Sequence, residues 1–284
     1  MADYPALDLT IRQDEGVLEL LDLAYAYLDD FGPLALHEHE DGCGLRVFFR
    51  SADVRDVARN GLEEQFGGRF AAITPVDVPD EGWARRSQAQ LTPVRVGRIL
   101  VTPPWVAAPD DPETLRIVIE PSMGFGTGHH ATTRLCLELL QNEAITDLRV
   151  IDVGTGSGVL AIAAWKLGAA DVDAIDCDPD ALQNAGENIV ANGATAIRTI
   201  EADLSAVHLA PADIVVANLT AGVLDRYAAN LLALVKPGGH LIVSGFAPDD
   251  LIGIERAFGR TAVEARQEGA WTAARIALNP PRSA

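Results

Sequence analysis

The chain has 284 residues, of which 48% are hydrophobic. This length and hydrophobic fraction suit one large or two modest folded domains and exclude intrinsic disorder as the main state. Acidic residues outnumber basic ones by 41 to 22, which gives a net charge of −19, and the sequence contains no local basic patch. Because this charge repels a phosphate backbone, we expect no direct binding of nucleic acid, whereas a basic protein partner would be attracted.

The cysteines and the apolar segments favour a cytoplasmic protein. Cys43, Cys136 and Cys177 are far apart and show neither disulfide nor metal-ligand spacing. The N-terminus is acidic and has no apolar segment, and the longest apolar stretch, residues 158–170, is too short to span a bilayer. We therefore expect a soluble cytoplasmic protein with no membrane partner.

The first 78 residues alternate between short predicted strands and helices. The strands are expected at residues 7–11, 34–37, 45–49 and 70–76, and the helices at residues 17–28 and 54–66. This β-α-β-β-α-β order is the ferredoxin-like pattern. Because it contains no catalytic cluster, residues 1–78 are interpreted as a small α+β domain that recognises another molecule.

Residues 79–90 are polar and charged, and they are interpreted as a linker to a second domain, residues 91–284. After a β-rich segment at 94–101, short apolar runs alternate with helical stretches. The runs are 149–153, 171–175, 196–200, 213–217 and 240–243. This alternation predicts an α/β domain with a doubly wound, Rossmann-like parallel sheet that is covered on both faces.

A glycine-rich turn follows the first of these strands. In Asp152-Val-Gly154-Thr-Gly156-Ser-Gly158, an apolar strand runs into three glycines at alternate positions, and a helix is predicted at 159–167. Glycines allow the backbone to turn tightly and to approach a ligand closely at the start of a helix. The alternative is a glycine-rich turn without a ligand.

Asp176 ends the next strand, 22 residues after Gly154, where a carboxylate commonly binds the hydroxyls of a ribose. A dinucleotide fingerprint needs its third glycine at position 159, which is Val159. The spacing here, with Asp152 two residues before the first glycine, instead resembles S-adenosylmethionine-dependent methyltransferases.

Two further polar residues follow later strands. Asp203 comes after the third strand, where an acid often lies near an adenine, but a solvated loop acid fits equally well. Asn218 follows the fourth strand, at the edge of the sheet where ligands bind, and its side chain can accept a hydrogen bond from an amine. A cap for a helix at 221–234 is the alternative function of Asn218.

The segment from Glu120 to Thr133 precedes the first strand of the sheet and is rich in glycine, threonine and histidine. Such a segment fills a core poorly and usually closes over a ligand. The adjacent histidines, His129 and His130, do not converge on one ion without partners, and no third ligand has a suitable spacing. We therefore expect no metal; either histidine is a candidate general base, but a role in loop structure fits better.

The chain resembles the PrmA methyltransferases from about Trp83 onward. The resemblance lies in Pro104-Trp105, Phe125-Gly-Thr-Gly-His-His-Ala-Thr-Thr133, the turn at 152–158, Ile175-Asp-Cys-Asp-Pro179 and Asn218-Leu-Thr-Ala221. It implies S-adenosyl-L-methionine as the cofactor and methylation of large-subunit ribosomal protein eleven at its N-terminal amine and at lysines. It also implies that the small N-terminal domain recognises this substrate.

By motif, the resemblance places the family's cofactor contacts on Thr133, Gly154, Asp176 and Asn218. Together with the glycine turn, the loop before the first strand and the acid after the third strand, the predicted cofactor-binding residues are Phe125, Gly126, Thr133, Gly154, Gly156, Asp176, Asp203 and Asn218, and Asn218 is also the predicted catalytic residue. The family's usual Gly-Thr-Gly-Thr-His-Pro-Thr-Thr reads Gly-Thr-Gly-His-His-Ala-Thr-Thr here, and Asn-Ile-Leu-Ala reads Asn-Leu-Thr-Ala. Both departures keep the polar cofactor groups and alter the rim where substrate would enter.

Three other functions remain open at this point. A methyltransferase of another protein lysine or of a small amine would keep every cofactor argument. A nicotinamide-dependent oxidoreductase is disfavoured by Val159, and a non-catalytic module would bind the cofactor without transferring a methyl group. We expect the enzyme to be a monomer.

Overall fold

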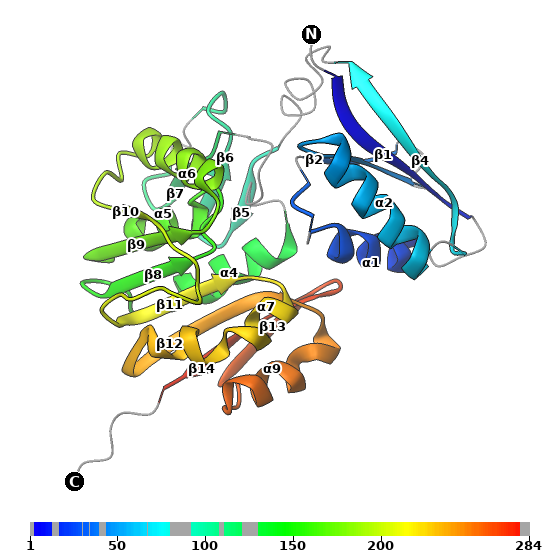
Figure 1. The fold of residues 1–284 in the computed structure, drawn as a ribbon. Helices are drawn as coiled ribbons and strands as arrows, with labels where there is room; N and C mark the ends of the chain where they lie inside the picture. The colour runs from blue at the N-terminus through cyan, green and yellow to red at the C-terminus, as the bar shows by residue number, and fades with distance from the viewer. Residues whose placement is uncertain are drawn as a thin grey trace. The chain divides into compact units, whose positions relative to one another are not determined.

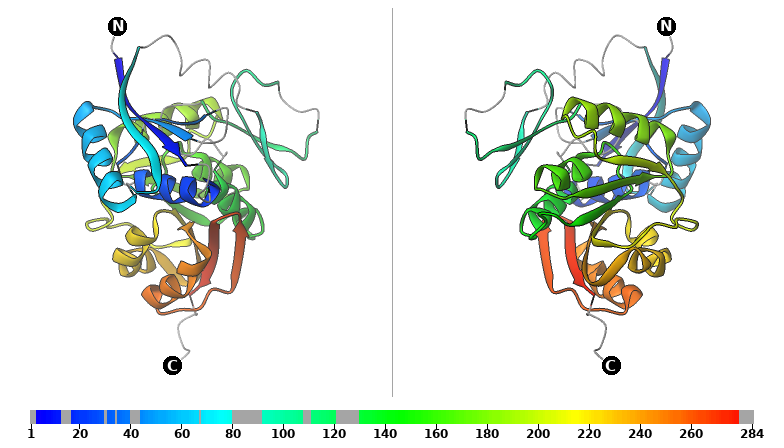
Figure 2. Two further views of the ribbon diagram at one scale, coloured as in Figure 1. Left: turned by 90° about the vertical axis from the view of Figure 1, so that its right-hand side faces the viewer. Right: turned by 90° about the vertical axis from the view of Figure 1, so that its left-hand side faces the viewer.

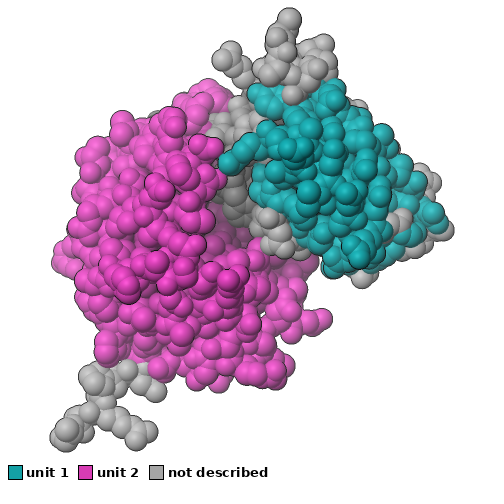
Figure 3. Space-filling view, in the orientation of Figure 1, with its two compact units in different colours: residues 1–91 teal, residues 92–284 magenta. Residues whose placement is uncertain are grey.

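In the computed structural model, the described residues are 3–12, 17–29, 31–33, 35–39, 44–66, 68–79, 92–107, 111–120 and 130–278. The chain divides into two compact units, Met1–Leu91 and Thr92–Ala284, which Figure 3 colours separately. The linker expected at 79–90 lies outside the described residues except for Pro79. Among the residues that the structure describes, no helix is long and apolar enough to cross a membrane.

Unit 1 has the predicted β-α-β-β-α-β order. Its elements are β1 (Asp3–Ile11), α1 (Val17–Asp29), β2 (Ala35–Glu38), β3 (Gly44–Phe48), α2 (Ala52–Phe66) and β4 (Phe70–Pro79). The antiparallel sheet has the strand order β2-β3-β1-β4. This arrangement confirms the ferredoxin-like prediction.

The core of unit 1 follows from the alternation of its strands. Leu7, Leu9 and Ile11 of β1 are buried on one face of the sheet, together with Leu45 and Val47 of β3. They pack with buried leucines and alanines of α1 and α2, so the two helices cover this face. The side-chain period of two residues in a strand places every second residue on this face.

The described residues of unit 2 form two sheets (Figure 1). A small sheet of order β5-β6-β7 comprises β5 (Val94–Val96), β6 (Ile99–Thr102) and β7 (Leu115–Val118). The large sheet comprises β8 (Arg149–Val153), β9 (Asp171–Asp176), β10 (Arg198–Glu201), β11 (Ala212–Asn218), β12 (Val235–Phe246), β13 (Glu264–Glu268) and β14 (Trp271–Ala277). These seven strands have the order β10-β9-β8-β11-β12-β14-β13. Its helices are α4 (Ala131–Gln141), α5 (Val159–Lys166), α6 (Pro179–Ala191), α7 (Ala221–Arg226), α8 (Ala228–Ala233), the short η1 (Pro248–Asp250) and α9 (Leu251–Phe258).

Helices cover both faces of the large sheet, as predicted. Val150 of β8 belongs to a core cluster that includes buried residues of α4, α5 and α6. Its neighbour Ile151 belongs to a second cluster that includes buried residues of α7, α8 and α9. Because successive residues of a strand point to opposite faces, the inner strands β8, β9, β11, β12 and β14 contribute to both clusters. This is the predicted Rossmann-like architecture.

The sheet differs from the wholly parallel prediction at its C-terminal end. The five strands β10, β9, β8, β11 and β12 are parallel, but β14 pairs antiparallel with β12, and β13 pairs antiparallel with β14. Figure 2 shows β13 and β14 as a red hairpin. Only the turn around Gly269, with φ of 56°, separates these two strands, and so short a connection permits antiparallel pairing alone.

The helix expected at 221–234 is two helices. Tyr227, between α7 and α8, has φ of −110° and ψ of 19°, which is not a helical conformation. The N-cap of α7 is Thr220, and Asn218 is the last residue of β11. Asn218 therefore does not cap the helix.

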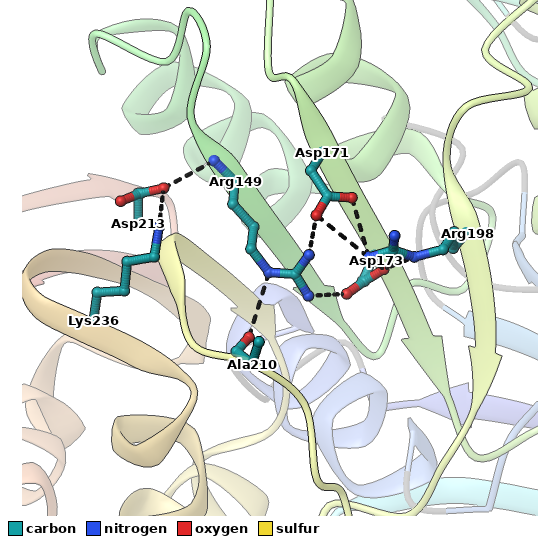
Figure 4. A network of polar contacts seen from close by, with 7 residues as sticks. All are labelled: Arg149, Asp171, Asp173, Arg198, Ala210, Asp213 and Lys236. Carbon is teal, nitrogen blue, oxygen red and sulfur yellow. Dashed lines mark hydrogen bonds and ion pairs between the residues drawn. The ribbon is translucent and has the colours of Figure 1, made fainter.

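A network of charges ties together the strands of the large sheet near their amino ends (Figure 4). Arg149 pairs with Asp171 and Asp173, and the guanidinium Nε of Arg198 donates to Asp173 at 2.7 Å. The side chain of Asp173 is fully buried between these two cations. The network neutralises a buried acid at the edge of the sheet opposite the carboxyl ends of its parallel strands.

Candidate cofactor and catalytic site

The glycine turn between β8 and α5 has a backbone that only glycine adopts readily. Gly154, Gly156 and Gly158 have φ values of 70°, 51° and 81°. The N–H groups of Gly154 and Thr155 both donate to the carbonyl of Ile175 at 2.9 Å. These bonds hold the turn against the carboxyl end of β9.

Asp176, the last residue of β9, lies directly against this turn. Its Oδ2 accepts a hydrogen bond of 3.0 Å from the N–H of Gly156, and its Oδ1 accepts one of 3.0 Å from the N–H of Asp178. The carboxylate is partly buried, and each oxygen keeps a further lone pair for another donor. Asp176 is thus held in one orientation at the edge of the sheet, beside the glycines.

Asp152 is buried beneath the same turn, with 1% of the residue exposed. Its Oδ2 accepts hydrogen bonds from Thr155 Oγ1 at 2.7 Å and from the N–H of Ala161 at 3.0 Å. Its Oδ1 is buried and has no hydrogen-bond partner among the described residues. Burial raises the pKa of this carboxyl to about 7, and the charge of Asp176 adds to the effect.

Asn218 and Thr133 come from elements far apart in the sequence and meet at this edge. Asn218 ends β11, which pairs directly with β8, and Thr133 is buried in the first turn of α4. The Nδ2 of Asn218 lies 3.5 Å from Thr133 Oγ1, at the limit of a hydrogen bond. The carboxyl ends of two adjacent parallel strands therefore bring Asn218 next to the glycine turn.

The residue after Asn218 connects that turn with the end of β12. A Cβ on Gly154 would stand 2.5 Å from Cδ2 of Leu219. A Cβ on Gly245, where φ is 101°, would stand 2.2 Å from the carbonyl oxygen of Leu219. Since the second contact is with backbone, only glycine fits at position 245. Sequence reasoning missed Gly245, although a glycine within a strand is a signal of close backbone approach.

His130 has a structural position in α4. It is the N-cap, and its Nδ1 lies 2.7 Å from Thr132 Oγ1. Its ring contacts the Trp271 ring edge-on, with centroids 4.8 Å apart. Burial lowers the pKa of His130 to about 4, and the Arg134 guanidinium acts in the same direction. A neutral capping histidine fits the predicted role in loop structure better than that of a general base.

Asp203, which follows β10, has fewer contacts than Asp176. Asp203 is exposed, and its Oδ1 accepts from the N–H of Ser205 at 2.7 Å, so hydrogen bonding by Ser205 lowers the pKa of its carboxyl. The N–H of Ala202 donates to the backbone carbonyl of Asp176, which places this segment beside the carboxylate that is predicted to bind a ribose. Phe125 and Gly126, as well as His129, lie outside the described residues.

The described residues contain no group of three or more histidine, cysteine or acidic side chains that could hold a metal ion. Cys136 is a free thiol that is buried, and burial raises its pKa. Cys177 is a free, exposed thiol directly after Asp176. Cys43 lies outside the described part of the chain.

Comparison with known proteins gives a consistent result. Residues 29–276 match the family model described as ribosomal protein L11 methyltransferase (PrmA). The ribosomal protein L11 methyltransferase of Geobacter sulfurreducens is 42% identical over 251 residues, which are 83% of this chain and 82% of that protein. The corresponding protein of Geotalea daltonii is 35% identical over 262 residues, or 87% of this chain and 80% of the relative.

A solved structure supports the same assignment. The ribosomal protein L11 methylase of Lactobacillus delbrueckii subsp. bulgaricus superposes with a TM-score of 0.61 at 30% sequence identity, covering 66% of this chain and 98% of that chain. The family model covers most of the chain, and the glycine turn and Asp176 lie where an adenosyl cofactor is expected. The chain therefore belongs to the PrmA family of ribosomal protein L11 methyltransferases, which are S-adenosylmethionine-dependent enzymes with the class I methyltransferase fold.

Proposed function

We propose that this enzyme transfers methyl groups from S-adenosyl-L-methionine to lysine side chains, the N-terminal amine, or both, of ribosomal protein L11. The observation that carries the proposal is the bond between Gly156 and Asp176, which joins the glycine turn to a carboxylate at the same edge as Asn218. The identity of the substrate, ribosomal protein L11, is inferred from the family to which the chain belongs.

The residues at this edge fit the cofactor. Asp176 has free lone pairs for two ribose hydroxyls, and the backbone of Gly154 and Gly156 allows close approach by the amino acid part. The buried Oδ1 of Asp152 has no partner among the described residues and is available for a hydrogen bond beneath the turn. The proposed cofactor-binding set is Phe125, Gly126, Thr133, Gly154, Gly156, Asp176, Asp203 and Asn218.

S-adenosylmethionine supplies a methyl group on a sulfonium, which is already a good leaving group. The protein must therefore mainly align an amine with that methyl group, and alignment of well-held reactants lowers a barrier by about 7–11 kcal/mol. Asn218 is the proposed catalytic residue because its carboxamide oxygen can accept a hydrogen bond from the amine and orient the nitrogen lone pair.

The amine must also lose its proton before it reacts. For a lysine this costs roughly 4–5 kcal/mol at pH 7, and for an N-terminal amine about 1 kcal/mol, given their ordinary pKa values. An apolar surrounding lowers the pKa of an amine and reduces this cost. His130 is committed to capping α4, so we assign no general base among the described residues.

The domain assignments and the partner belong to the same proposal. Residues 1–78 recognise the substrate, residues 79–90 connect the domains, and residues 91–284 bind the cofactor and catalyse transfer. The net charge of −19 attracts a basic ribosomal protein and repels nucleic acid. The enzyme acts in the cytoplasm as a monomer.

The test is transfer of a labelled methyl group. The enzyme is incubated with methyl-labelled S-adenosylmethionine and a mixture of unmethylated large-subunit ribosomal proteins, and mass spectrometry locates the label. We expect label on amines of L11. The Asn218→Ala variant should lose at least tenfold in kcat for L11. Label on another protein, or cofactor binding without transfer, would contradict the proposal.

A further inference from the structure

Helix α6 presents asparagines to two different partners. Asn192, the C-cap of α6, binds Val118 at the end of β7 with both ends of its carboxamide. The Val118 N–H donates to Asn192 Oδ1 at 2.9 Å, and Asn192 Nδ2 donates to the Val118 carbonyl at 2.6 Å. The side chain thus takes the place of a neighbouring strand. Asn192 Nδ2 also donates to the backbone carbonyl of Asn188, one turn earlier in α6, at 2.8 Å.

Asn188, one helical turn earlier, makes a different set of bonds: within α6 its Nδ2 donates to Asn184 Oδ1 at 3.2 Å, and the carboxamide makes two further bonds outside the helix. Its Oδ1 accepts from the N–H of Glu120 at 2.8 Å, just beyond β7. Its Nδ2 donates to the carbonyl of Ser157 at 2.9 Å, within the glycine turn. Asn188 is fully buried, and Ser157 is 1% exposed. One carboxamide therefore joins the glycine turn to the segment that follows β7.

The backbone of α6 also approaches the glycine turn directly. A Cβ on Gly158 would stand 3.3 Å from Cβ and 3.4 Å from Cα of Ala185. Gly158 is the N-cap of α5 and makes no side-chain cap bond. The second half of the turn is therefore supported from one side by α6, through Ala185 and Asn188. Its first half is held by β9, through the carbonyl of Ile175.

We infer that Asn188 is a positioning residue for S-adenosylmethionine binding, because its bond to Ser157 holds the glycine turn in the geometry that receives the cofactor. This inference rests on the proposed cofactor site. Asn188 touches the turn from the side of α6, so its effect on the cofactor passes through the backbone at 157–158. A buried hydrogen bond that is lost leaves the Ser157 carbonyl without this donor.

The test compares Asn188→Ala with Asn192→Ala, a matched control on the same helix. Both changes remove one carboxamide bonded to backbone near β7, and alanine favours helix at both positions. Calorimetry should show S-adenosylmethionine binding about tenfold weaker in Asn188→Ala and unchanged in Asn192→Ala. The melting temperatures of both variants should fall, so the affinity is the readout that separates the two roles.

A second variant keeps the acceptor for Glu120 and removes only the Nδ2 donor, which bonds to the glycine turn and to Asn184. Asn188→Asp, measured at pH 8, keeps an oxygen for the Glu120 N–H but removes the donor to Ser157, and it should weaken cofactor binding as Asn188→Ala does. The inference is wrong if Asn188→Asp binds like the wild type, or if Asn192→Ala loses as much affinity as Asn188→Ala. A wild-type protein that binds no S-adenosylmethionine would instead overturn the proposed cofactor site, and the inference with it.

Discussion

Gly156 and Asp176 are joined directly: the N–H of the glycine donates a 3.0 Å hydrogen bond to the carboxylate of the aspartate. The edge of the sheet that is proposed to bind the cofactor therefore already holds its principal acid in place.

Asp176→Ala removes the carboxylate and should weaken S-adenosylmethionine binding at least a hundredfold, since bonds to a charged group contribute about 1.5–3 kcal/mol each. Calorimetry measures the effect. Asp171→Ala, at the other end of β9, is the control and should bind normally; equal losses would contradict the assignment of Asp176.

Gly245→Ala should impair catalysis through Leu219. The new Cβ would stand 2.2 Å from the Leu219 carbonyl oxygen, so the backbone after Asn218 must move. We expect kcat to fall at least tenfold. Gly238→Ala is the matched control, because Gly238 also has a positive φ, 86°, but an added Cβ there would have nothing within 4 Å. That control should lose about 1–2 kcal/mol of stability and keep its kcat. A normal kcat in Gly245→Ala would show that the position of Asn218 does not depend on this contact.

Asp152 should make stability depend on pH between about 4 and 7. Its pKa is raised in the folded protein from 3.8 to about 7, so the folded state retains a proton that the unfolded state has lost. Stability from this group is present below pH 4 and declines as the pH rises to about 7, by roughly 4 kcal/mol in all. Asp152→Asn cannot titrate.

The measurement for Asp152 is the difference in melting temperature between wild type and Asp152→Asn from pH 4 to pH 8, without cofactor. We expect the variant to gain relative to the wild type as the pH rises and the difference to level off above pH 7. Parallel pH profiles would show that Asp152 titrates normally.

Asp173→Ala should reduce stability without affecting the cofactor site. Arg149 would lose a fully buried partner, and breaking a buried pair in this way costs about 3–5 kcal/mol. Asp77→Ala removes the exposed partner of Arg55 and should cost less than about 1 kcal/mol. Denaturant unfolding compares the two variants, and calorimetry at a temperature where both are folded should give unchanged S-adenosylmethionine affinity. A loss of affinity in Asp173→Ala would link the amino edge of the sheet to the site.

Much of this arrangement is readable from local sequence. The strand at 149–153 coincides with its predicted bounds, and Asp176 and Asn218 end their strands as expected, because apolar runs followed by a polar residue mark the carboxyl edge of a parallel sheet. The two contacts that support the site were not predicted. Asn188 bonds to residues 31 and 68 positions away, and Gly245 meets the backbone of Leu219, and neither distance is encoded in a local pattern.

Two errors of the sequence interpretation have physical causes. The segment 221–234 is apolar at helical spacing throughout, so nothing local reveals the break at Tyr227. The hairpin of β13 and β14 was missed because Glu264–Glu268 is polar at nearly every position and lacks the alternation of a half-buried strand.

That polarity of β13 has a consequence for self-association. The two outermost strands of the large sheet are β10, only four residues long, and β13, which exposes its charged side chains. Arg266 and Glu268 are bound to acidic or basic neighbours at this border. Short or charged outer strands discourage another chain from adding itself to the sheet. The outer strands of this sheet therefore protect the protein against aggregation by edge-to-edge strand pairing.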